Sequence, residues 1–185
     1  ILPEPAVLLF STLALASFTA FAQQKKLQFW LLSVISLALA FLLKPFVGFL
    51  APAFLAVAWL FYDKFYQQPL FYLYPIISLT PLIGWRTWIK NFPQGVPASD
   101  WLFNSTKIRL RPAWFRWLFY ERLTKLIAGF SNLIFFFFNL IKRDKLFFVI
   151  AAWWAGLVSY LIVIATGNVR HDYYQNLLLP VIALT

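Results

Sequence analysis

The residues of this sequence that can do chemistry are few, and the first of them stands at the start of an apolar run. Glu4 lies between two prolines in the sequence LPEP. A carboxylate held there can bind a divalent cation, or it can take a proton from an acceptor hydroxyl as a general base. The alternative is a solvated residue at a helix N-terminus, where negative charge is favourable. The sequence alone leaves both interpretations open.

A lysine is the second candidate, because Lys44 interrupts the apolar stretch 27–62. A lysine at the centre of a bilayer costs about 2.5–3.5 kcal/mol on insertion scales. This cost is avoided if the lysine lies at a turn and its side chain reaches a polar cavity or a lipid phosphate. The alternative is a lysine at a helix end whose side chain extends to the membrane surface.

Basic residues also gather in a polar, aromatic stretch that begins at Arg86. The arginine guanidinium suits bidentate phosphate binding. Attraction to anionic lipid headgroups explains most of these charges without a specific site. The candidate phosphate ligands of this stretch are Arg109, Arg111, Arg116 and Arg122.

The sequence GNVRHDYYQN, residues 167–176, places polar residues between two apolar runs. Arg170 and His171 can hold a phosphate, and Asp172 can orient either of them. Tyr173 can stack on a sugar or, with Tyr174, mark the membrane interface. The alternative is a polar turn between two membrane helices.

The composition predicts an integral membrane protein. Hydrophobic residues make up 62% of the 185 residues and charged residues 12%. Long apolar runs without period-two alternation favour helices over a barrel. With no cysteine and one histidine, the chain has no thiolate site and no histidine cluster for a metal. The net charge of +10 therefore indicates lipid phosphates as partners, not nucleic acid.

We expect an all-α fold, a polytopic transmembrane helix bundle that forms a single domain over residues 1–185. We expect the polar loop 86–125 to contain an interfacial helix that begins at Pro112. The chain begins at Ile1 and ends inside an apolar run, so we expect it to be a segment of a longer protein. The predicted spans are 5–22, 27–43, 46–62, 69–85 (kinked by Pro75 and Pro81), 126–141, 146–166 and 174–185.

Four stretches, taken in order, resemble the middle of the polytopic GT-C glycosyltransferases. They are LPEPAVLLFSTLALASFTAF, LALAFLLKPFVGFLAPAFLAV, PIISLTPLIGWRTW and NVRHDYYQNLLLPVIAL. Within these transferases, the resemblance is to the group of the dolichyl-phosphate-mannose protein mannosyltransferases and the lipid A aminoarabinose transferases. The resemblance covers nearly the whole chain; each motif alone is loose, and their order and spacing make it more specific.

This resemblance implies a membrane enzyme that moves a sugar from a polyprenyl-phosphate donor to a protein, lipid or glycan acceptor. The active site would face the extracytoplasmic side of the plasma (inner) membrane. Glu4 matches the second acidic position of the family, with Glu in place of the commoner Asp. The first acidic motif would precede Ile1, so the segment alone should be inactive. Lys44 matches the family's TK-type turn, although Leu43 replaces the usual small polar residue.

Two points of mechanism and topology follow from the resemblance. Transfer would invert the configuration: an acidic group upstream of Ile1 would deprotonate the acceptor, while a divalent cation or basic residues stabilise the departing lipid phosphate. The stretch YYQNLLLP would begin a late span on the extracytoplasmic face, which also makes the long basic loop extracytoplasmic. That loop violates the positive-inside rule, whereas the short basic loops obey it.

Two other classes of protein fit the same sequence. One is a transporter or flippase-like bundle, in which Lys44 and the proline-rich spans line a substrate path. The other is a structural membrane subunit, which would tolerate neutralisation of Glu4, Lys44 and Arg170 together.

Overall fold

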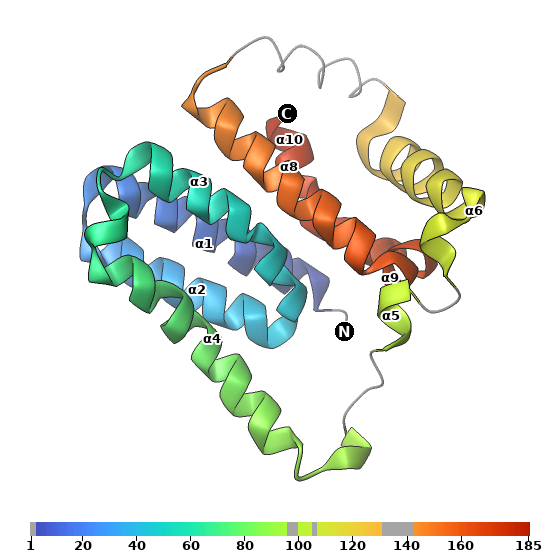
Figure 1. Cartoon of the computed structure of the whole chain (residues 1–185), viewed down its shortest axis with the longest axis horizontal. Coiled ribbons are helices and arrows are strands. Elements are labelled where there is room, and N and C mark those ends of the chain that lie inside the picture. Colours follow the sequence, from blue (N-terminus) through green and yellow to red (C-terminus); the bar gives the residue numbers. More distant parts are fainter. Residues whose placement is uncertain (1–2, 96–99, 105–106, 131–142) are drawn as a thin grey trace. The chain divides into compact units, whose positions relative to one another are not determined.

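A computed structural model describes residues 3–95, 100–104, 107–130 and 143–185 of the chain. Every regular element in these ranges is a helix, so the predicted all-α class is confirmed. The chain divides into two compact units, residues 1–97 and 98–185, which are described separately below (Figure 1).

The described part of the first unit contains four main helices and the short 3₁₀-helices η1 (Pro45–Leu50), η2 (Phe65–Gln67) and η3 (Pro93–Gly95). The tight turn after α1 depends on Lys25, which adopts a left-handed conformation with φ 59° and donates its N–H to the Phe21 carbonyl. This turn makes α1 and α2 antiparallel neighbours. The elements are α1 (Glu4–Gln24), α2 (Leu27–Leu43), η1 (Pro45–Leu50), α3 (Ala51–Phe61) and α4 (Pro69–Ile89).

The second turn of this unit is set by Pro45. Lys44 is extended, with φ −148° and ψ 111°, as a residue before proline usually is. Pro45 then begins η1, and Pro52 stands in the first turn of α3, where its missing N–H is not needed. The stretch predicted as one helix, 46–62, is therefore a 3₁₀ turn followed by a short α-helix.

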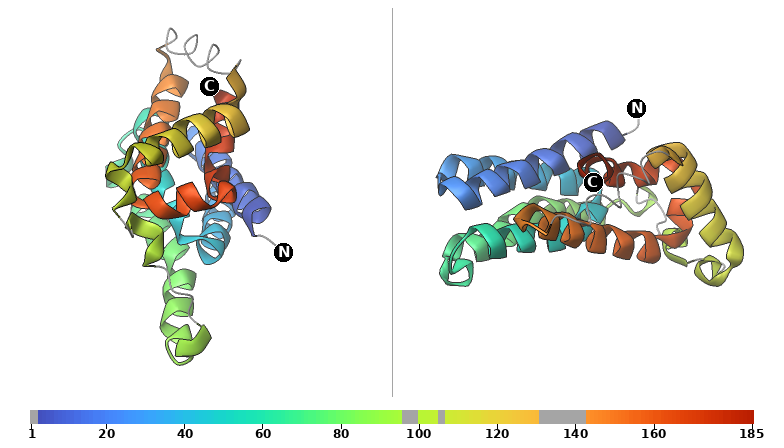
Figure 2. Two further views of the ribbon diagram at one scale, coloured as in Figure 1. Left: turned by 90° about the vertical axis from the view of Figure 1, so that its right-hand side faces the viewer. Right: turned by 90° about the horizontal axis from the view of Figure 1, so that it is seen from above.

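Hydroxyl groups and aromatic rings join the four helices of this unit. The Ser33 hydroxyl lies 2.6 Å from the Ala14 carbonyl and 2.6 Å from the Tyr74 hydroxyl, so it links α1, α2 and α4. The Phe18 ring contacts those of Phe54 and Tyr74, with centroids 5.2 and 4.7 Å away. Beyond Pro81, α4 extends away from the other three helices (Figures 1 and 2), and its side chains there are largely exposed.

The second unit is built around α8 (Lys145–Val163). Asp144 caps it by accepting a hydrogen bond of 2.9 Å from the Phe147 amide. The predicted span 146–166 ends early, at Val163, because Ile164 leaves the helical region with φ −92° and ψ 45°. The elements that follow are α9 (Ala165–Arg170), η6 (Asp172–Leu178) and α10 (Leu179–Leu184), so the predicted span 174–185 is partly a 3₁₀-helix.

The residues before α8 form short or wide helices. They are α5 (Trp101–Asn104), η4 (Ile108–Leu110), α6 (Pro112–Phe115) and the π-helix η5 (Arg116–Ala128). The interfacial helix predicted from Pro112 corresponds to α6 and η5. Most of the predicted span 126–141 lies outside the described residues.

Among the described helices, α1 and α8 are long and apolar enough to cross a membrane. Two further apolar helical stretches, Leu27–Leu43 and Pro45–Phe61, are shorter. By length and composition the chain therefore has membrane-associated character.

The link made by Ser33 gives a first prediction. Ser33→Ala leaves the buried Tyr74 hydroxyl without this partner, so the free energy of unfolding should fall by about 1–3 kcal/mol. Ser159 is the matched control, because it is exposed and bonds only to the Ala155 carbonyl of its own helix. Ser159→Ala should change the free energy by less than about 0.5 kcal/mol. Denaturant titration of both variants in detergent measures the difference, and equal effects would contradict the link.

Candidate functional site

The structure brings the two strongest sequence candidates, Glu4 and Lys44, into contact. The helix α1 has 21 residues and α2 has 17, which are about 31 Å and about 26 Å of helix. Because the two helices are antiparallel, the end of α2 returns to the level where α1 begins. The Lys44 ammonium Nζ lies 2.6 Å from Oε1 of Glu4.

Burial of this ion pair decides between the interpretations of each residue. The side chain of Glu4 is 4% exposed and that of Lys44 is 14% exposed. Glu4 is therefore not a solvated residue at the helix start, although it does occupy the first turn of α1. Lys44 extends toward a carboxylate and not toward the surface. Each charge is held in place by the other, as buried charges require.

The second carboxylate oxygen of Glu4 has unused hydrogen-bonding capacity. Oε1 faces Lys44, whereas Oε2 is buried and has no hydrogen-bond partner among the described residues. Buried polar atoms without partners are uncommon in folded proteins and call for an explanation. The geometry leaves this oxygen available to a proton donor that enters the site.

The same geometry does not fit a divalent cation. No group of three or more His, Asp or Glu side chains lies together in the described part of the chain. Glu4 has an ammonium 2.6 Å from one of its oxygens, where a cation would compete with it. Divalent cations need several oxygen ligands, so Glu4 with Lys44 is better described as a base and its counter-charge than as a metal ligand.

A second group of candidates lies in the other unit, around the turn between α9 and η6. The His171 ring stacks on the rings of Tyr173 and Tyr174 at 5.0 and 5.9 Å and meets the edge of Trp101 at 5.7 Å. The guanidinium of the exposed Arg170 lies 5.8 Å from the Trp101 ring. His171 and Arg170 therefore belong to an aromatic cluster, in which cation–π attraction orients the arginine.

Asp172 has a different partner from the two that the sequence suggested. Its Oδ2 lies 3.6 Å from Nη1 of Arg122, and its Oδ1 accepts a hydrogen bond from the Tyr173 amide. Arg122 also lies 6.0 Å from the Trp117 ring. This contact brings one arginine of the basic stretch to the polar turn, a pairing the sequence did not predict.

The remaining arginines of the basic stretch have separate surroundings. Arg109 donates a hydrogen bond of 3.4 Å to the Val163 carbonyl, at the C-terminus of α8, where positive charge is favourable. Arg111 and Arg116 are exposed. The structure gives Arg109 a helix-capping contact, and phosphate binding by these residues stays a prediction.

Sequence reasoning missed a buried polar cluster beside His171. Asn168 and Gln175 are fully buried. Nε2 of Gln175 donates to the carbonyl oxygens of Asn168 and His171, the latter at 3.3 Å. A Cβ on Gly167 would lie 3.1 Å from side-chain atoms of Leu102 and Ile164, so a larger residue in α9 would require these side chains to shift. Part of the stretch that suggested a polar connector is therefore interior structure.

Family models, curated proteins and solved structures were compared with this chain, and none matches it. The geometry and chemistry of the residues thus remain the basis for inferring a function.

The ion pair gives a second prediction. Glu4→Gln or Lys44→Met leaves one buried charge unpaired, so each should lower the free energy of unfolding by about 3–5 kcal/mol. The double variant removes both charges and should lose clearly less than the sum of the single variants.

The control for this cycle is the more accessible pair of Glu121 and Lys125, which are 3.2 Å apart and four residues from each other. Its coupling free energy should be about 0.5 kcal/mol or less. Denaturant unfolding of the wild type and of the two single variants and the double variant of each pair measures both couplings. Additive effects of Glu4 and Lys44 would show that the two side chains do not interact.

Proposed function

We propose that this chain belongs to a membrane glycosyltransferase that takes a sugar from a polyprenyl-phosphate donor. The acceptor is an extracytoplasmic protein, lipid or glycan. The chain's apolar helices cross the membrane several times, with the Glu4 and Lys44 end of the first unit at the extracytoplasmic side.

The buried contact between Glu4 and Lys44 is the observation that carries this proposal. The Glu4 carboxylate, which we propose as a general base, lies 2.6 Å from the Lys44 ammonium, which we propose binds phosphate. A base and a phosphate-binding cation are the two functions that transfer from a phosphate leaving group needs. The resemblance of LPEP and LLKP to the transferase motifs supports the choice of these two residues, because it rests on the sequence and not on their contact.

In the proposed step, the acceptor hydroxyl oxygen attacks the anomeric carbon as the bond from that carbon to the phosphate oxygen breaks. The bonding electron pair leaves with the lipid phosphate, and configuration at the carbon inverts. Lys44 moves from Glu4 to the phosphate and neutralises its charge. Oε2 of Glu4, which has no hydrogen-bond partner among the described residues, accepts the hydroxyl proton or shares that task with a further carboxylate.

The basic and aromatic residues of the second unit are candidates for phosphate and sugar binding in their own right. Arg122, Arg170 and His171 are candidates for the lipid phosphate, and Tyr173 for stacking on the sugar. Arg109, Arg111 and Arg116 are candidates for attracting the anionic donor.

A transporter or flippase-like protein is the second candidate. Interrupted helices that line a substrate path are typical of transporters. Here α8 is interrupted at Ile164, and α4 contains Pro75 and Pro81. Such a protein would move lipid-linked sugar between leaflets without releasing the sugar, so consumption of the donor distinguishes the two candidates.

The third prediction concerns turnover. In the full-length protein, Glu4→Gln should lower the rate of donor consumption by about 10²–10⁴-fold, because the base is lost. Release of polyprenyl phosphate from a radiolabelled donor measures the rate in detergent. Glu121→Gln removes a carboxylate from a pair on η5 and should leave the rate unchanged. Unchanged turnover in a folded Glu4→Gln protein would exclude this role for Glu4.

A further inference from the structure

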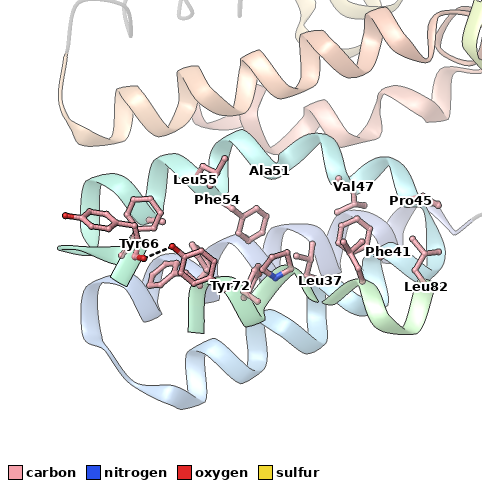
Figure 3. A pocket seen from close by; sticks show the side chains of 18 residues that line it. Leu37, Phe41, Pro45, Val47, Ala51, Phe54, Leu55, Tyr66, Tyr72 and Leu82 are labelled. Carbon is pink, nitrogen blue, oxygen red and sulfur yellow. Dashed lines mark hydrogen bonds between the residues drawn. The ribbon is translucent and has the colours of Figure 1, made fainter. Parts of the chain in front are cut away.

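The first unit contains an open apolar groove of about 600 Å³ that no sequence motif predicted (Figure 3). It lies between α3 and α4, because α3 packs against α1 while α4 packs against α2. Small residues widen it on the side of η1 and α3, where Gly48, Ala51 and Ala58 line it. Phe54 and Tyr74 are buried and line it as well. The groove is therefore an opening onto the packed aromatic core of the unit.

The shape of the groove suits one extended hydrocarbon chain. Its lining runs along η1 and α3 from Pro45 to Ala58, which is roughly 20 Å of helix. One leaflet contributes about 15 Å of the hydrocarbon core. Two of its lining residues, Leu55 and Tyr72, are 61% and 59% exposed although they are large and apolar or aromatic. A lipid chain in the groove would cover both.

The two ends of the groove differ in charge. Pro45 lies at the end where Lys44 is neutralised by Glu4. Phe65 and Tyr66 lie at the opposite end, directly after Lys64 (Figure 3 labels Tyr66). The turn between α1 and α2 reaches this second end too, because Nζ of Lys25 lies 3.0 Å from the centroid of the Tyr62 ring. Asp63 interacts with Lys25 as well, so the turn that holds Lys25 and Lys26 lies beside the segment that holds Asp63 and Lys64.

These lysines differ in their surroundings. Desolvation lowers the pKa of Lys25, and the Asp63 carboxylate partly offsets this effect. Lys26 and Lys64 are exposed, and Lys64 has a left-handed backbone with φ 50°. An anionic group at the mouth of the groove would therefore meet Lys26 and Lys64 first.

We infer that the groove binds one acyl chain of an anionic phospholipid whose phosphate lies between Lys26 and Lys64. Each basic residue near a membrane surface adds appreciable attraction for anionic lipids. The inference rests on the membrane location proposed above and not on the transferase reaction. In the proposed reaction the polyprenyl-phosphate donor places its phosphate at the other end, near Lys44. The lysines of the second end are therefore left for the phosphate of another anionic lipid, and charge complementarity favours a phospholipid there.

Native mass spectrometry of the full-length protein tests this site. The protein is taken from nanodiscs of equal parts phosphatidylglycerol and phosphatidylcholine, and the lipids that remain bound in detergent are counted. One phosphatidylglycerol should be retained per chain, in preference to phosphatidylcholine. Lys26→Gln with Lys64→Gln should reduce this preference about tenfold. Arg86→Gln with Lys90→Gln, at the opposite end of α4, removes the same charge and should leave the preference unchanged.

Filling the groove tests the position of the acyl chain. Ala51→Phe places a ring inside the groove, and retention should fall at least about tenfold. Ala56→Phe, on the same helix but outside the lining, is the matched control and should retain the lipid. Gly48→Leu is a second filling variant, because its Cβ would meet only the Phe41 ring at 3.5 Å.

Three outcomes would overturn the inference. They are equal retention of the two phospholipids, retention unaffected by both filling variants, and displacement of phosphatidylglycerol by equimolar polyprenyl phosphate. None of them depends on transferase turnover, so the lipid site and the proposed reaction can fail separately.

Discussion

A buried carboxylate needs a counter-charge, and in this chain Lys44 supplies it for Glu4. This constraint determines how α1 and α2 are arranged in the first unit. The end of α2 must lie at the level where α1 begins, so that the two residues can meet. The turn at Pro45 then directs η1 and α3 back along α1. Replacing a buried ion pair by apolar residues is often neutral or stabilising. Stability alone therefore does not explain this pair, whereas the chemistry proposed for Glu4 does.

The sequence predicted the helices of the first unit well, since local rules determine their ends. The residue before Pro45 cannot continue α2 easily, and the bounds of α2 are those predicted. The ion pair could have been predicted as well, because α1 and α2 have similar lengths and a two-residue turn joins them. The sequence around Glu4 and the sequence around Lys44, each taken alone, do not indicate that the two side chains meet.

The groove and the contacts of the second unit depend on packing between residues that are distant in the sequence, which the periodicity of apolar residues does not reveal. The groove exists because α3 and α4 pack on different partners. Asp172 pairs with Arg122, fifty residues earlier, and not with its neighbours His171 or Arg170. The apolar run before Thr166 ends as a helix at Val163 without a proline or glycine to signal it. Gln175 and Asn168 are polar yet fully buried, and their side-chain amide groups donate to the backbone carbonyls of Asn168 and Ile164.

Exchanging the two charges tests the central claim most directly, since it separates support of the fold from chemistry. In Glu4→Lys with Lys44→Glu the ion pair can re-form, but the carboxylate no longer stands at the start of α1. We predict that the exchanged protein regains much of the stability lost in either single variant, while donor consumption stays as low as in Glu4→Gln. Recovery of wild-type turnover in the exchanged protein would contradict the account, because the position of the carboxylate would then not matter.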